Sequence, residues 1–381
     1  MIKRSHAMLS PVLDIVRENQ TVVPTGNHSS FQKLWESELR TAVSEAGEIA
    51  EFTEVEKKQA SQFLGFISDA MSLFTQEAEN PSWIRMTSEQ RFAKVKSIQD
   101  APQIPQRSEE WYKNYSKVLT ASEFSALFSQ NKRRRDLVYS KIQSIHDQPI
   151  QYRTACSTQE MNALGWGIRF EPVVKQLIEY RDKCSIFEPG RLQHPTNTHL
   201  AASPDGVIEK ASNPAQLGRL IEIKCPYSRT IGGEIPYDYW IQMQIQMEVT
   251  DIDECEYIEA HLLSLKANQS EPLDLSGTTY RGYIYLLQTV SEPYAYKYIY
   301  GDVGSIEMPS LPEGYTCIET IPWGLKSWHR KVVHRDRAWY EATKPWQEAF
   351  WNDVEQVRKG GELAAPTPKQ KPQAACLITD D

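Results

Sequence analysis

The stretch between residues 159 and 300 constrains the fold most, because helical and strand-like patterns alternate along it. Apolar side chains recur at helical intervals over 159–182 and again over 237–249. Short apolar runs bounded by turn residues, which are typical of strands, lie at 185–190, 199–208, 218–227, 255–263, 280–289 and 294–300. Further helical patterns cover 107–115, 121–129, 134–145 and 335–358. The alternation predicts a mixed α/β domain.

Proline and glycine divide the 381 residues into three regions. Residues 1–105 are expected to form a helical N-terminal region of unknown role, since apolar residues recur at helical spacing over 31–78 and APQIP closes the region at 101–105. Residues 106–359 form the α/β domain. Residues 360–381 hold Gly, Pro and Gln without periodicity, which is typical of a disordered tail.

Several classes of protein are excluded by what the sequence lacks. No apolar run approaches the ~18 residues of a membrane span, and the first 25 residues lack a signal-peptide pattern. We therefore expect no membrane association and an intracellular protein, in the nucleus or cytoplasm if its source is eukaryotic or viral. The six cysteines form no C-x-x-C pair, and neither H-E-x-x-H nor a glycine-rich phosphate loop occurs. Zinc, iron–sulfur and nucleotide-binding sites consequently lack their motifs.

The net charge of −8 argues at first against nucleic acid as a partner. The charge is unevenly distributed, however, because residues 106–230 hold 18 basic and 13 acidic side chains whereas residues 231–310 are strongly acidic. The basic segment contains KRRR at 132–135, which is either a solvated helix start or a patch that contacts phosphates. A local basic face is therefore compatible with DNA binding.

Two short runs, ASPDGVI (202–208) and LIEIKCP (220–226), carry the residues with chemical potential. Glu222 and Lys224 are two apart, so in a strand they project from the same face. A hairpin-like return between the runs would bring Asp205 beside Glu222. Asp205, Glu222 and the carbonyl of Ile223 are hard oxygen ligands of the kind that Mg²⁺ prefers, and Lys224 could position a water or stabilise negative charge. The alternative for E-x-K is an exposed ion pair.

A third acid, Glu171, lies in the helical run 163–181 between apolar neighbours. An unpaired charge there would be costly, and a bound metal would offset that cost. The alternative is a surface glutamate in the first turns of a helix.

Five segments together resemble the YqaJ viral recombinase family of lambda-type exonucleases, within the PD-(D/E)XK nuclease superfamily. These segments are EEWYKNYSKVLTASEF (109–124), ALGWGIRFEPVVKQLIE (163–179), AASPDGVI (201–208), IEIKCPYSR (221–229) and YWIQMQIQMEVT (239–250). The resemblance implies a restriction-endonuclease-like core with a mixed central sheet flanked by helices. It also implies Mg²⁺-dependent cleavage of DNA, with Mn²⁺ as a substitute, and 5′-to-3′ digestion of linear duplex ends. A single-strand-annealing recombinase partner and a ring-shaped homo-oligomer are further implications.

The resemblance also implies roles for individual residues. Asp205, Glu222 and Lys224 match the catalytic trio, and Glu171 matches the helix-borne acid that joins them at the metal. Gln242 matches a glutamine of the family that could touch the water or the phosphate, and the alternative is that it belongs to a polar helix face. Gln246 lies on the same face of the helix, whereas Gln244 points away. The residues that match a 5′-phosphate pocket are Thr120, Ser122, Ser203 and Arg229.

Two points remain open in that pocket. Thr120 and Ser122 could simply cap a helix, with Glu123 in its first turn. Tyr115 stands where the family pattern has Arg, which leaves Lys113 or Lys117 to supply the positive charge.

The sequence thus predicts a Mg²⁺-dependent exonuclease that resects linear duplex DNA for recombination, repair or viral DNA processing. An endonuclease or flap nuclease on the same core is one alternative, and a catalytically silent DNA-binding recombination factor is another.

Overall fold

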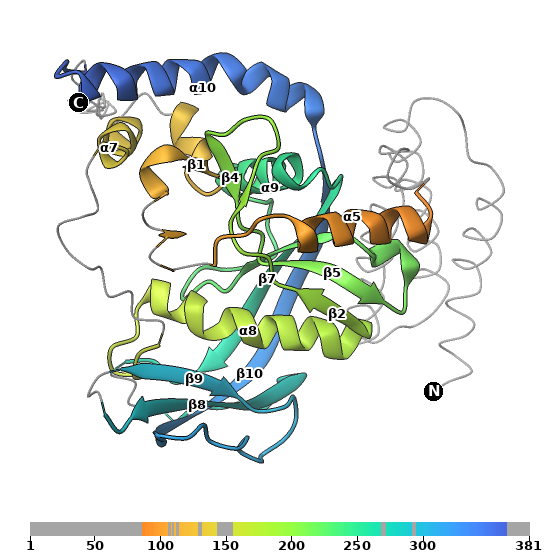
Figure 1. Ribbon diagram of the computed structural model, residues 1–381. Coiled ribbons are helices and arrows are strands. Elements are labelled where there is room, and N and C mark those ends of the chain that lie inside the picture. Colours follow the sequence, from red (N-terminus) through yellow and green to blue (C-terminus); the bar gives the residue numbers. More distant parts are fainter. Residues whose placement is uncertain are drawn as a thin grey trace, which may run out of the picture. The chain divides into compact units, whose positions relative to one another are not determined.

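The computed structural model describes residues 86–105, 108, 110–111, 114–128, 132–142, 155–267, 272–291 and 295–363. The helical pattern over 31–78 and most of the tail expected to be disordered lie outside these residues. The expected mixed α/β architecture is confirmed in the described part of the chain (Figure 1).

A seven-stranded sheet forms the centre of the domain, with strand order β2-β5-β6-β7-β10-β8-β9. The pair β6–β7 is parallel and the other neighbours are antiparallel, so the sheet is mixed as predicted. The strands span Cys184–Phe187 (β2), Gly206–Ala211 (β5), Leu220–Lys224 (β6), Glu254–Ser264 (β7), Tyr280–Thr289 (β8), Tyr296–Tyr300 (β9) and Tyr315–His334 (β10). A second sheet joins Leu119–Thr120 (β1), Leu200–Ala202 (β4) and Leu192–Gln193 (β3) in the order β1-β4-β3.

Helices cover the sheet and complete the domain. They are Ser88–Asp100 (α5), Lys132–Ser140 (α7), Ala163–Asp182 (α8), Tyr237–Thr250 (α9) and Arg337–Arg358 (α10), with 3-10 turns at Tyr115–Lys117 (η1), Phe124–Phe128 (η2) and Pro214–Gln216 (η4). Helix α8 begins at Asn162, whose side chain accepts from the amide of Gly165, and packs on β2, β6 and β9. Helix α5, on the N-terminal side of residues 101–105, packs on β5.

The core lies between α8 and the central sheet. The apolar stripe of α8 predicted from the sequence is completely buried, and it consists of Phe170, Val173, Val174, Leu177 and Ile178. Ile221 and Ile223 of β6 join the same cluster. At roughly 25 cal/mol per Å² of apolar area, burial of this interface is the main force that fixes α8 against the strands.

Three segments differ from the sequence-based expectation. The run 199–208 divides at Pro204 into β4 and β5, which belong to different sheets, because proline cannot continue a strand ladder. The pattern at 121–129 forms the short 3-10 turn η2 in place of a helix. Strand β10 was not predicted, because proline and charged residues interrupt its apolar pattern; it is kept in the sheet by partners on both sides, β7 and β8.

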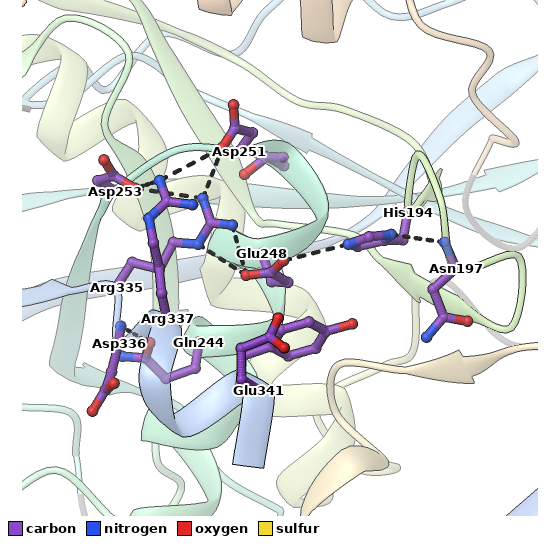
Figure 2. A network of polar contacts seen from close by, with 12 residues as sticks. His194, Asn197, Gln244, Glu248, Asp251, Asp253, Arg335, Asp336, Arg337 and Glu341 are labelled. Carbon is purple, nitrogen blue, oxygen red and sulfur yellow. Dashed lines mark hydrogen bonds and ion pairs between the residues drawn. The ribbon is translucent and has the colours of Figure 1, made fainter. Parts of the chain in front are cut away.

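Arg335, at the junction of β10 and α10, ties the end of α9 to the sheet (Figure 2). Its guanidinium contacts Glu248 at 2.6 Å, Asp251 at 2.9 Å and Asp253 at 3.4 Å. Lys94 of α5 also pairs with Asp251. We call Arg335, Glu248, Asp251 and Asp253 the arginine latch.

A histidine extends the arginine latch toward the turn between β3 and β4. His194 Nδ1 accepts from the amide of Asn197 at 2.9 Å, so its Nε2 carries the proton and faces Glu248 at 3.4 Å (Figure 2). The latch thereby fixes α9, and α9 in turn lines the candidate site. In the described part of the chain, no helix combines the length and the apolar character that a bilayer span requires.

Candidate active site

The beginning of β5 and the end of β6 bring Asp205 next to Glu222. Asp205 comes directly before β5, and Gly206 pairs with Ile221 across the antiparallel ladder. A carboxylate oxygen of Asp205 accepts from the amide of Ile223 at 2.7 Å. A Cβ atom at Gly206 would lie 2.4 Å from Ile186 Cγ2, so only glycine fits after Asp205.

Glu222 and Lys224 project from the same face of β6, as their spacing predicts. The Lys224 ammonium donates to Glu222 Oε1, and Gln246 of α9 donates to Oε2 at 2.7 Å. Glu222 is completely buried, so the pair is not the exposed ion pair that the sequence left as an alternative. A buried pair of this kind is costly to desolvate and is therefore weak evidence for a purely stabilising role.

Glu171 reaches the same region from α8. Its carboxylate pairs at 2.8 Å with Lys175, one helical turn later, and is about one-third exposed at 31%. Lys175 also contacts Glu188 at 2.9 Å. Glu171 is therefore partly a surface residue, and its charge acts on Asp205 across a short distance.

The charges of the site are crowded in a low-dielectric environment. Burial, with the carboxylates of Glu222 and Glu171, raises the pKa of Asp205 well above its ordinary value. Burial alone would lower the pKa of Lys224, but Glu222 and Asp205 outweigh it and raise that pKa. Close carboxylates that raise one another's pKa in this way are typical of functional sites.

The donors fit a hard divalent cation such as Mg²⁺. Asp205, Glu222 and the carbonyl of Ile223 supply oxygen atoms only, which suits Mg²⁺ and not a softer metal. Among the described residues, no three His, Cys, Asp or Glu side chains form a closed metal cage, so Glu171 does not complete one. Gln246 Oε1 is buried and has no hydrogen-bond partner within the described part of the chain, which fits a place for an ordered water at the site.

The three glutamines of α9 have different surroundings. Gln246 holds Glu222, and Gln244 points away to accept from the amide of Asp336 at 2.6 Å. Gln242, the residue that matches the family, is half-buried. Its predicted role at the site stays a prediction. The direct partner of Glu222 is thus Gln246. The sequence indicated this residue only by its spacing, since a position four residues after Gln242 lies on the same face of a helix.

Thr120, Ser122 and Ser203 lie at neighbouring strand ends. Strands β1 and β4 are parallel, with Thr120 beside Ala201, so the segments that follow both strands leave the sheet together. The hydroxyls of Thr120 and Ser122 are 3.4 Å apart. Glu123 accepts from both the amide and the hydroxyl of Thr120, so this hydroxyl acts as a donor to a neighbouring carboxylate.

Arg229 and Lys224 both lie near the ring of Tyr239. The Arg229 guanidinium pairs with Glu259 of β7 and lies 5.7 Å from the ring centroid of Tyr239. The same ring lies 4.8 Å from the Lys224 ammonium. Tyr239, which the sequence reasoning missed, therefore neighbours both cations, and its aromatic character three residues before Gln242 was the available signal.

Lys141 supplies a positive charge beside Tyr115, at a place for which the sequence offered Lys113 or Lys117. Its fully buried ammonium pairs with Glu123 at 2.9 Å and lies 3.7 Å from the Tyr115 ring centroid. Burial lowers the pKa of Lys141, and Glu123 opposes that effect. Lys117 is exposed and Lys113 lies outside the described residues.

The KRRR run opens helix α7, as one of its two predicted characters requires, whereas phosphate contact stays a prediction. Arg134 pairs with Asp353 of α10 at 2.5 Å, and Arg133 pairs with Asp238 of α9 at 2.8 Å. Lys132 is 82% exposed. The run therefore anchors α7 to two helices while it keeps positive charge at the surface.

A buried acid–lysine set between a hairpin of β-strands and a flanking helix defines the kind of site found here, and one family model matches the segment that contains it. Residues 110–253, which contain every predicted site residue, match the model of the YqaJ-like viral recombinase domain. The match falls on the stretch that contains the motifs, so this part of the chain is similar to that family.

Known proteins of related sequence and structure give further context. "Uncharacterized protein R354" of Acanthamoeba polyphaga mimivirus is 25% identical over 349 residues, which cover 80% of this chain and 61% of that protein. This chain is similar to a crystal structure of an alkaline exonuclease (LHK-Exo) from Laribacter hongkongensis, with 18% identity, a TM-score of 0.40 and coverage of 66% of this chain and 95% of the other. A phage-related exonuclease from Haemophilus somnus 129PT gives 12% identity, a TM-score of 0.38 and coverage of 64% and 96%.

Proposed function

We propose that this protein is a metal-dependent deoxyribonuclease, and specifically a Mg²⁺-dependent exonuclease that resects linear duplex DNA in the 5′-to-3′ direction. The observation that carries the proposal is the convergence of Asp205, Glu222 and Lys224 at one buried edge of the sheet. The YqaJ-like domain supports the same reading, since it spans all of these residues.

Each side chain has a distinct task in this scheme. Mg²⁺ bound by Asp205, Glu222 and the Ile223 carbonyl would supply an activated water and charge neutralisation at the phosphate. Lys224 has a raised pKa and remains protonated, so it stabilises the negative charge that develops on the phosphodiester. Gln246 holds the Glu222 carboxylate in place, and the amide of Ile223 does the same for Asp205.

End recognition follows from the polar groups around this centre. Thr120, Ser122 and Ser203 would approach a terminal 5′-phosphate from one side and Arg229 from the other, because guanidinium groups bind phosphate oxygens bidentately. Lys141 takes the place of the family arginine, but Glu123 neutralises it. We therefore expect a modest preference for 5′-phosphorylated ends over 5′-hydroxyl ends.

Cleavage of end-labelled linear duplexes with Mg²⁺ or Mn²⁺ tests the proposal. The wild type should release nucleotides from the 5′ end, and Asp205→Asn and Lys224→Met should lose nearly all activity. Lys344→Met, which removes an exposed lysine of α10, is the matched control for Lys224→Met and should retain it. Equal rates in the wild type and both site variants would contradict the proposal.

A covalently closed circle distinguishes the alternatives within nucleases. An exonuclease leaves the circle intact, whereas an endonuclease nicks it. DNA binding without any metal-dependent product would instead favour a silent recombination factor. Co-purification with a strand-annealing recombinase and sedimentation as a ring-sized oligomer would test the remaining partners that the family implies.

A further inference from the structure

Five aromatic side chains form a continuous surface strip beside the candidate active site. Tyr237 and Trp240 of α9 have ring centroids 5.6 Å apart and nearly parallel planes. Trp240 contacts Trp339 of α10 at 5.1 Å, and Phe128 of η2 follows at 6.2 Å from Trp339. Trp346 of α10 closes the series at 5.7 Å from Phe128. We call Tyr237, Trp240, Trp339, Phe128 and Trp346 the aromatic strip.

The strip is open to solvent at both ends. Tyr237 is 60% exposed and Trp346 is 46% exposed, whereas the three rings between them are half-buried. The buried ring of Phe124 supports the middle of the strip from below, 6.1 Å from Trp339. The strip is therefore a fixed platform on packed helices and not a set of mobile side chains.

The chemical character of the strip differs from that of the exposed apolar surface around β8 and β10. The exposed side chains around β8 and β10 are aliphatic, namely Val290, Ile306, Met308, Leu311 and Ile318. Aliphatic surface suits protein contacts, whereas flat rings with open faces suit stacking with nucleic-acid bases. The strip consists of rings alone, which favours bases as its ligand.

Positive charge lines the strip. Arg133 of α7 donates to Ser125 of η2 at 2.7 Å and pairs with Asp238, the residue between Tyr237 and Tyr239. Lys132 precedes it and is largely exposed. Helix α7 packs against η2 and α10, which carry Phe128 and Trp346. Stacking rings beside cations are the combination that single-stranded nucleic acid requires.

The strip is also continuous with the candidate site. Tyr239 faces Lys224 and Arg229, and Tyr237 and Trp240 belong to the same turn of α9. Exposed Ser122 immediately precedes the segment that leads into η2. A strand that leaves the site past Tyr239 would meet the strip directly.

We propose that the aromatic strip binds a single strand of DNA, with bases stacked on Tyr237 and Trp346 and phosphates facing Lys132 and Arg133. The inference deepens the proposed nuclease function, on which its choice of DNA rests. It gives the enzyme a place for the strand that becomes unpaired when a duplex end is resected.

Binding of a fluorescently labelled oligothymidylate of about 12 nucleotides, followed by anisotropy with the full chain in EDTA, tests the proposal. Without a divalent metal no cleavage occurs, so binding is measured separately from the nuclease reaction. Trp346→Ala and Tyr237→Ala should each weaken binding by roughly 10-fold, because stacking on one base is lost. Trp346→Phe should restore most of the affinity, since it keeps a ring.

Phe92→Ala provides the matched control, because Phe92 is a similarly exposed aromatic residue on α5, outside the strip. It should bind like the wild type, and unchanged thermal unfolding midpoints would establish that all variants are folded. Affinities of Trp346→Ala and Tyr237→Ala equal to that of the wild type would overturn the proposal.

Two further outcomes would also overturn it, and neither affects the nuclease proposal. One is a wild type that cuts duplex DNA but binds no oligothymidylate. The other is strip variants that reduce self-association in sedimentation while they bind the oligonucleotide normally, because the strip would then be a protein contact. Failure of the nuclease proposal would instead appear as an absence of metal-dependent products.

Discussion

The arginine latch and the candidate active site are both partly buried charge clusters, and they are built in opposite ways. In the latch, Arg335 meets Glu248, Asp251 and Asp253, and hydrogen bonds from cations lower the pKa of Glu248 and of Asp251 despite their burial. In the site, burial and neighbouring carboxylates raise the pKa of Asp205. In the latch the cations outweigh the effect of burial on the carboxylates, whereas in the site Lys224 and Lys175 do not outweigh it at Asp205. Raised carboxylate pKa values of this kind are expected at binding and catalytic sites.

Asp205→Asn gives the sharpest test of this contrast. The substitution should reduce cleavage by roughly 10³-fold or more, since it removes a metal ligand. It should also raise the free energy of unfolding in metal-free buffer by on the order of 1 kcal/mol, because it relieves carboxylate repulsion. Single-turnover cleavage and urea denaturation measure the two effects. A lower free energy of unfolding for Asp205→Asn would contradict the idea that carboxylate repulsion destabilises the site.

Arg335→Met should have the opposite effects to Asp205→Asn, with a large loss of stability and a smaller loss of cleavage. Removing the guanidinium leaves Glu248 and Asp253 buried without their main partner, which costs about 3–5 kcal/mol of stability. Cleavage at low temperature, where the domain remains folded, should be less affected. Urea denaturation is the measurement, and Arg337→Met, at a more exposed position beside Asp253, is the control with a small expected effect.

Gln246→Leu probes the contact between α9 and Glu222. Loss of the amide that positions a metal-ligating carboxylate should raise the metal concentration for half-maximal activity by about 10–100-fold. Gln242→Leu, one turn earlier, tests the family-based expectation on the same helix. If only Gln242→Leu changed the metal requirement, the geometric assignment of Gln246 would be wrong.

The smallest expected effect is the change of the stability difference between the wild type and Arg335→Met at acid pH. The pKa values of Glu248 and Asp251 are lowered in the folded state, so their contribution to stability is present above their ordinary pKa and is lost as the pH falls through the lowered pKa. The stability difference between the wild type and Arg335→Met should therefore shrink between about pH 5 and pH 3. Denaturation curves at several pH values would show it, and a gap independent of pH would speak against charge pairing as its source.

Sequence reasoning found the centre of the site because short-range geometry determines it. A spacing of two in a strand places Glu222 and Lys224 on one face, and the hairpin formed by β5 and β6 returns the chain so that Asp205 lies beside Glu222. Residues that depend on helix rotation and on long-range packing were harder to place. The contact of Gln246 with Glu222 was not predicted, because the side of α9 that meets β6 is set by tertiary contacts.

Lys141 and β10 are two further features that local sequence patterns do not predict. Nothing near Lys141 in the sequence connects it to Tyr115, 26 residues earlier, and only the folding of α7 against η2 brings them together. Strand β10 owes its extended form to β7 and β8 on either side, so its own residues carry little of the signal. The mixed α/β class was predictable, whereas the strand order was not.

The length of β10 has a consequence for how the chain is made on the ribosome. Strand β7 ends at Ser264, and its second neighbour in the sheet is not synthesised until Trp323–His334 emerges. During that interval β7 presents an unpaired edge next to the catalytic strand β6. A nascent chain in this state is open to pairing with other chains, so the yield of active protein should depend on how quickly translation passes from β7 to the end of β10.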